Sequence, residues 1–177
     1  MDHTATHQIL AVDIQERFLP HITQYSEVVN NTEKLLTAAE LLSLEILLFE
    51  QYPQGLGRTD ERLIGFHIRR FEKTSFSALN DPLSKAAISL NPTTIKVVVG
   101  LEAHVCVYQT VQDLLRLKQP VIVVADAIAS RNIQHKAWAI DQLRNDGAII
   151  MSLEAVLFDI LKDAKHPHFK AISKLIR

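Results

Sequence analysis

The chain has 177 residues, of which 47% are hydrophobic, and this is enough for one globular domain with one core. We therefore predict a single domain over residues 1–177. Its 19 Lys and Arg residues balance 20 Asp and Glu residues, which leaves a formal net charge of -1. The composition gives no general attraction to nucleic acid or to an anionic membrane, so we expect neither as a partner.

The only cysteine is Cys106, which excludes an intramolecular disulfide. The polar start MDHTATHQ lacks the charged and apolar blocks of a secretory signal. No apolar run reaches the roughly 20 residues that a membrane-spanning helix needs. We expect an intracellular, cytoplasmic protein without a membrane segment.

Short apolar or β-branched runs alternate with longer stretches of helical periodicity along the whole chain. In chain order, the pattern predicts a strand at 8–13, a helix at 26–43, strands at 44–49 and 68–72, a helix at 81–90, a strand at 95–100, a helix after Gly100, a strand at 121–126, a helix at 133–146, a strand at 148–152, and helix from Leu153 onward with a break near Pro167. Four of the strands are almost wholly apolar, as strands covered on both faces must be. The sequence therefore predicts an α/β fold with a mostly parallel sheet and right-handed crossovers.

Polar side chains recur where the predicted strands end. They are Asp13, Glu50 and Gln51, Lys73, Cys106 at the start of the next helix, and Asp126. In a doubly wound sheet the ligand crevice lies at this edge, where the strand order reverses. If the first and fourth strands are neighbours, Asp13 and Cys106 share one cleft.

A thiol and a carboxylate in one cleft can perform nucleophilic catalysis. Only the thiolate attacks, and a helix N-terminus at Cys106 would depress the pKa of the thiol. Asp13 can accept the proton, while the Lys73 ammonium favours the anionic forms. Unpaired N–H groups in the first turn after Gly100 could stabilise an oxyanion.

Each of these residues also has a purely structural interpretation. Cys106 can pack in the core as a small hydrophobe, and Asp13 can cap the turn that follows it. Lys73 can be a solvated surface lysine. Asp126 can fix the loop AIASRN before the next helix.

Four segments, LAVDIQERF, EKTSFSAL, VVVGLEAHVCVYQTVQDLL and VIVVADAIASR, resemble the isochorismatase-like family of cysteine hydrolases and occur in the family's order. FEQYPQGLGRT and HPHFKAISKLIR are similar to the subgroup of isochorismatase domain-containing proteins. The resemblance implies a three-layer, Rossmann-like fold with a six-stranded sheet. It implies a catalytic triad of Asp13, Lys73 and Cys106. It also implies a cis peptide between Leu101 and Glu102, with the backbone N–H groups of Glu102 and Cys106 at the oxyanion.

The activity implied by the resemblance is hydrolysis of a small amide-like molecule through a thioester on Cys106, in a homo-oligomer. Vinyl-ether hydrolysis with Asp13 as the acid remains an alternative, and so does a redox-sensing or catalytically idle protein of the same fold. We expect no cofactor and no metal, because FEQYPQ lacks the Asp-x-His pair that nicotinamidase members carry there. His3 and His7 fall in the predicted tail, and His166 and His168 lack the spacing of a zinc helix.

Five residues are candidates for the wall of the substrate pocket because they lie in loops or helix starts near the cleft. They are Gln15, Phe18, Tyr52, Phe76 and His104. Phe18 and Phe76 could instead be core aromatics, and His104 could face solvent or another subunit.

Overall fold

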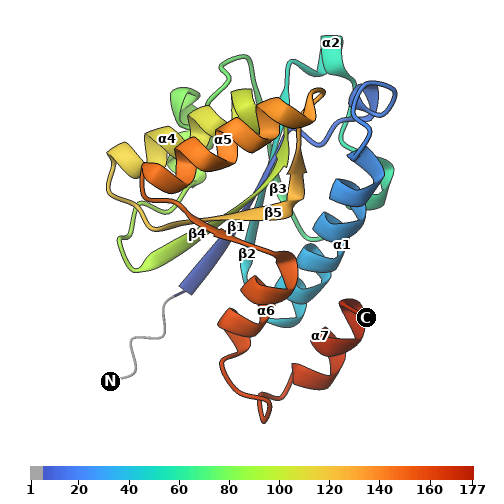
Figure 1. Ribbon diagram of the computed structural model, residues 1–177, viewed down its shortest axis with the longest axis vertical. Coiled ribbons are helices and arrows are strands. Elements are labelled where there is room, and N and C mark those ends of the chain that lie inside the picture. Colours follow the sequence, from blue (N-terminus) through green and yellow to red (C-terminus); the bar gives the residue numbers. More distant parts are fainter. Residues whose placement is uncertain (1–5) are drawn as a thin grey trace.

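The computed structural model describes residues 6–177 and has three layers, with helices on both faces of one sheet (Figure 1). The strands are β1 (Thr6–Val12), β2 (Glu45–Gln51), β3 (Arg69–Lys73), β4 (Thr94–Leu101), β5 (Val121–Ala129) and β6 (Ile149–Met151). The helices are α1 (Tyr25–Leu41), α2 (Pro53–Leu56), α3 (Pro82–Ala87), α4 (Tyr108–Arg116), α5 (Ile133–Asn145), α6 (Leu153–Leu161) and α7 (Phe169–Leu175). Short turns are η1 (Glu16–Phe18), η2 (Glu61–Leu63), η3 (Ala78–Asn80) and η4 (Ala103–Val107). Within the described residues no helix is long and apolar enough to cross a membrane.

The six strands pair in the order β3-β2-β1-β4-β5-β6, and all pairs are parallel. The predicted α/β class and six-stranded sheet are confirmed. β1 and β4 are neighbours, so the strand order reverses between them and a crevice is expected at their carboxyl ends.

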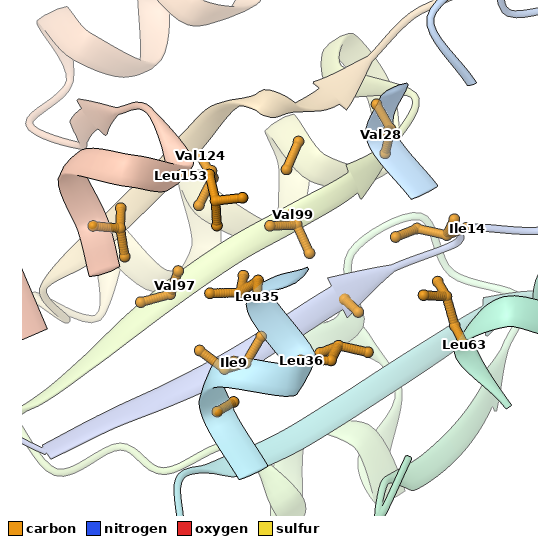
Figure 2. Close-up of a cluster of buried hydrophobic side chains, with 14 of the residues drawn as sticks. Ile9, Ile14, Val28, Leu35, Leu36, Leu63, Val97, Val99, Val124 and Leu153 are labelled. Carbon is orange, nitrogen blue, oxygen red and sulfur yellow. The ribbon is translucent and has the colours of Figure 1, made fainter. Parts of the chain in front are cut away.

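Two helical layers cover the sheet because successive strand residues face opposite sides. Ile9 and Ala11 face the cluster that includes side chains of α1, α6 and α7. Figure 2 shows part of that cluster, with Leu35 and Leu36 of α1 lying over the sheet. Leu10 and Val12 face the other cluster, which α4 and α5 cover. Both faces of β1 are therefore buried, which explains its apolar sequence.

Gly100 allows β1 and β4 to approach closely at the edge that carries the site. Its φ is 137°, and a Cβ there would lie 2.0 Å from the carbonyl oxygen of Val12, its register partner. Only glycine fits both the dihedral angle and the space. The contact brings the residues after Val12 next to those after Gly100.

Asp126 does not end its strand, contrary to the sequence prediction. A register irregularity between Val98 and Gly100 accompanies an extended β5, which continues to Ala129. Asp126 Oδ1 accepts a hydrogen bond of 2.7 Å from the backbone N–H of Leu153. The carboxylate thus holds the start of α6 and does not fix the loop after β5.

The prediction that His7 lies in an N-terminal tail is also wrong. This residue lies in β1 and is buried, because pairing of β1 with β4 begins at Thr6, the first described residue. His3 lies outside the described residues.

Candidate functional site

The three candidate catalytic residues come from different strands and meet at one edge of the sheet. Asp13 directly follows β1, Lys73 is the last residue of β3, and Cys106 lies in η4, after β4. Asp13 has a φ of 55°, a left-handed conformation that Asp tolerates better than most residues. Its backbone N–H donates to the carbonyl oxygen of Phe49 at 3.0 Å, which fixes the turn against β2.

Lys73 and Asp13 form a buried ion pair. Lys73 Nζ lies 2.8 Å from Asp13 Oδ2, and the two side chains are 0% and 1% exposed. Lys73 Nζ also donates to the carbonyl oxygens of Ser75 at 3.2 Å and Phe76 at 3.0 Å. The alternative that Lys73 is a solvated surface lysine is therefore wrong.

Gln51 is a further partner of Lys73 that sequence reasoning did not identify. Its Oε1 accepts from Lys73 Nζ at 2.8 Å, and its Nε2 donates to the carbonyl oxygen of Thr74 at 2.7 Å. The second hydrogen bond fixes the amide with its oxygen toward the ammonium group. The place of Gln51 at the end of β2, beside β3, was the available signal.

The Gln15 side chain bonds to backbone groups of the protein and so supports the position of Gln51. Its Oε1 accepts from the backbone N–H of Gln51 at 2.8 Å, and its Nε2 donates to the carbonyl oxygens of Gln51 at 3.0 Å and Gly57 at 2.7 Å. The side chain is fully buried. Gln15 therefore joins the turn after Asp13 to the end of β2.

Cys106 is 6% exposed and packs in the same hydrophobic cluster as Val12 and Val107. Burial raises the pKa of its thiol, the Asp13 carboxylate raises it further, and the Lys73 ammonium opposes both effects. The predicted depression of this pKa is wrong, because loss of solvation outweighs the positive charge nearby. Cys106 is thus a buried thiol, but one that lies next to the other two residues.

Asp13 has an oxygen available on the side that Lys73 does not occupy. Among the described residues Asp13 Oδ1 has no hydrogen-bond partner. Burial raises the pKa of Asp13, while the ion pair with Lys73 and the neighbouring thiol both lower it. A carboxylate with a raised pKa is a better proton acceptor than an exposed one.

The turn between β4 and α4 is built without the cis peptide expected between Leu101 and Glu102. All peptide bonds of residues 6–177 are trans, and the chain turns instead through Gly100 and through Glu102, whose φ is 0° and ψ is 97°. The carbonyl oxygen of Glu102 accepts from the N–H groups of Val105 at 2.9 Å and Val107 at 3.4 Å. These bonds wind η4 and set Cys106 in it.

The Glu102 side chain contacts Arg131 and His104. Its carboxylate lies 2.5 Å from Arg131 Nε and 3.3 Å from His104 Nδ1. His104 Nδ1 also lies 2.9 Å from Ser130 Oγ, and its ring is 4.9 Å from that of His135. Burial lowers the pKa of His104, although Glu102 acts in the opposite direction.

The remaining pocket candidates are spread around this edge. Tyr52 is 53% exposed after β2, and Phe76 is 52% exposed after β3, so neither is a core aromatic. Phe18 is partly buried against the cluster under α1. Within the described residues no group of three or more His, Cys, Asp or Glu side chains could hold a metal ion.

Comparison with known proteins identifies the family. Residues 7–155 match the family model described as the isochorismatase domain. The chain belongs to the isochorismatase family. The match spans every strand of the sheet and every residue of the candidate site.

A relative agrees with that assignment, and solved structures share the fold. Isochorismatase domain-containing protein 2 of Danio rerio is 38% identical over 168 residues, which are 95% of this chain and 85% of that protein. A Caenorhabditis elegans structure described as MAR1 ribonuclease has a TM-score of 0.90 and 35% identity, over 98% of this chain and 90% of that one. The YcaC protein of Escherichia coli, described as an octameric hydrolase of unknown specificity, has a TM-score of 0.86 at 18% identity and covers 99% of this chain and 88% of that one. Family membership supports a hydrolase, and the structural matches support the three-layer fold.

Proposed function

We propose that the protein hydrolyses a small amide-like substrate with Cys106 as the nucleophile, Asp13 as the proton-transfer group and Lys73 as their electrostatic partner. The observation that carries the proposal is the buried pair of Lys73 Nζ and Asp13 Oδ2 at 2.8 Å, with Asp13 Oδ1 unpartnered among the described residues and the Cys106 thiol near enough to lower the pKa of Asp13. A buried ion pair has no need of a thiol neighbour for stability, whereas a nucleophile needs a base close to it.

The first half of the reaction forms a thioester. Asp13 accepts the proton of the Cys106 thiol as Sγ bonds to the carbonyl carbon, and the carbonyl oxygen becomes an oxyanion. The backbone N–H groups of Glu102 and Cys106 are the proposed oxyanion donors. When the tetrahedral intermediate collapses, the C–N bond breaks and Asp13 returns its proton to the departing amine or ammonia.

The second half releases the acid. Asp13 accepts a proton from water as the water oxygen attacks the thioester carbon, and the C–S bond then breaks. The proton on Asp13 passes to the sulfur, which restores the thiol. Throughout the cycle Lys73 keeps its contact with Asp13 and offsets the negative charge of the site.

The raised pKa of the Cys106 thiol accords with this cycle. A thiol that stays protonated in the resting protein must lose its proton as it attacks, and the adjacent base is Asp13. The raised pKa of Asp13 favours that transfer over release of the proton to solvent. Attack by the thiol is thus coupled to proton transfer to Asp13, whether the electrophile is a substrate or an alkylating reagent.

Other functions remain distinct alternatives. Vinyl-ether hydrolysis would use Asp13 as an acid and would not require the sulfur. The description of the Caenorhabditis elegans relative raises RNA as a substrate, but the net charge of -1 provides no general attraction to a polyanion. A redox sensor with one cysteine would have to form its disulfide with another molecule.

The experiment is a turnover screen of small amides, esters, imides and a short RNA, with Cys106→Ala as the matched control. We expect hydrolysis of a C–N or ester bond by the native protein and its loss in the variant. Turnover that survives in Cys106→Ala would contradict the nucleophile and favour chemistry centred on Asp13.

We also propose that the protein forms a homo-oligomer. The support is the exposed apolar surface of α5, where Ile133 is 70% and Trp138 61% exposed, and the octameric state of the Escherichia coli YcaC protein. Light scattering of the native protein and of Trp138→Glu would test it. A native mass of about one chain, the same as that of the variant, would contradict it.

A further inference from the structure

A cavity of about 290 Å³ lies among the loops that follow the carboxyl ends of the strands. It is lined by Arg17, Phe18, His21, Gly55, Leu56 and Arg131. These residues come from the loops after β1, β2 and β5, and η1 and α2 lie together at the top of the molecule (Figure 1). Three of the six can carry positive charge and none is acidic, in a protein whose overall charge is nearly balanced.

Arg17 carries a charge that the described residues do not neutralise. Its Nη1 donates to the carbonyl oxygen of Gly55 at 2.6 Å, which holds the guanidinium group at the rim of the cavity. No carboxylate of residues 6–177 lies within ion-pair distance of Arg17. A guanidinium group held by one acceptor keeps its other N–H groups for a ligand.

Arg131 connects the cavity to the proposed reaction centre. Its Nε lies 2.5 Å from Glu102 Oε1, and Glu102 is the proposed oxyanion residue, four positions before Cys106. Glu102 is 5% exposed, so the contact anchors Arg131 to a buried group. A molecule in the cavity can therefore contact Arg131, which itself contacts the segment that carries Cys106.

We propose that the substrate carries an anionic group of the size of a carboxylate, which binds between Arg17 and Arg131 while its reacting carbonyl faces Cys106. This inference rests on the proposed function, because it assumes that Cys106 is the nucleophile. Guanidinium groups match a carboxylate through paired N–H donors, and Phe18 offers apolar surface to the remainder of the substrate. The site would favour an amide of an acid over a neutral amide.

Two alkylating reagents of similar size test the inference before any substrate is known. Iodoacetate carries a carboxylate and iodoacetamide a neutral amide, and both form a C–S bond with Cys106 and release iodide. The quantity measured is the ratio of the iodoacetate rate to the iodoacetamide rate, by mass spectrometry of the native protein. We expect Arg17→Gln to lower this ratio by roughly five- to tenfold.

Three further variants make the result specific. Arg131→Gln should lower the ratio too, while Arg17→Lys, which keeps the charge, should retain most of it. Arg116→Gln is the matched control, since Arg116 is 71% exposed, lies on α4 and pairs with Asp113. The effect should also shrink in about 1 M salt, where charges are screened within a few ångströms.

The outcomes separate this inference from the function on which it rests. Labelling by both reagents with the same ratio in the native protein, Arg17→Gln and Arg131→Gln would overturn the anionic site and leave the nucleophile in place. If neither reagent labels Cys106 until the protein unfolds, the assignment of Cys106 as the nucleophile is contradicted, and so is the anionic site that depends on it.

Discussion

Gln51 shows how much of the site depends on one neutral side chain. It is the side-chain acceptor that shares Lys73 Nζ with Asp13, and because it is neutral, one buried carboxylate balances one buried ammonium group. A second carboxylate at this position would compete with Asp13 for Lys73. The amide therefore orients Lys73 without changing the charge of the site.

Replacing Gln51 by Leu should destabilise the protein by about 1–3 kcal/mol, because Lys73 and the Thr74 carbonyl each lose a buried hydrogen-bond partner. Urea unfolding measures the loss. Gln54→Leu is the matched control, since Gln54 is exposed and its replacement should change stability by less than about 0.5 kcal/mol. Equal losses in the two variants would show that Gln51 has no such role.

Sequence reasoning brought Asp13 and Cys106 together because polar residues at the ends of parallel strands share one edge of the sheet, and the family resemblance added Lys73 as the third member. It could not give the direction of the thiol's pKa. That direction depends on how deeply η4 packs against β1, and the packing of side chains distant in sequence is not encoded in local pattern. The contacts of Gln15 and Gln51 were missed for the same reason.

At the scale of elements, the close approach of β1 and β4 at Gly100 determines where the site can form. An added side chain can destabilise a glycine position in two ways, through backbone strain at a positive φ and through overlap of the new Cβ with a neighbour. Three glycines differ in which of these applies. Gly65 has neither an unusual φ nor a neighbour within 4 Å of an added Cβ, Gly147 has a φ of 107° but open space, and Gly100 has a φ of 137° and a Cβ contact of 2.0 Å.

We expect the loss of stability on substitution by Ala to increase from Gly65 to Gly147 to Gly100. Strain alone should cost Gly147→Ala about 1–3 kcal/mol, and Gly100→Ala should lose more because backbone must also move. Thermal or urea unfolding of the three variants gives the order. A Gly100→Ala variant as stable as Gly147→Ala would contradict the close contact between the strands.

The elements themselves were predictable because both signals, apolar strands and helical periodicity, are local. The extension of β5 to Ala129 was not. It accompanies the register irregularity between β4 and β5, which arises where the two strands pair and leaves no mark on either sequence alone. The prediction that the strand ends at Asp126 was wrong for this reason.

At the scale of the whole molecule, stability should depend on a lysine far from the site. Lys96 is fully buried in β4, and its Nζ donates to the carbonyl oxygens of Asn91 and Thr94 and to Gln119 Oε1 at 3.1, 2.7 and 2.6 Å. All three acceptors are neutral. Burial lowers the pKa of Lys96 from 10.5 to about 8.

The sign of the pH dependence follows from that shift. Between about pH 8 and pH 10.5 the unfolded chain binds more protons at Lys96 than the folded protein does, so stability rises with pH through this window. We expect the free energy of unfolding of the native protein to rise relative to Lys96→Met over that range. Urea unfolding at several pH values measures the difference, in which contributions of other groups cancel.

Lys85→Met, at an exposed position, is the control and should show no such trend relative to the native protein. A constant difference between the native protein and Lys96→Met across the window would mean that burial does not perturb Lys96.

The most direct test of the central claim, that Asp13 and Cys106 act as one unit, is the pH dependence of Cys106 alkylation by iodoacetamide in the native protein and in Asp13→Asn. Removing a carboxylate beside the thiol should lower the midpoint of alkylation by about one pH unit or more, although it should abolish turnover. The same midpoint in both proteins, or a thiol that reacts only after unfolding, would contradict the account.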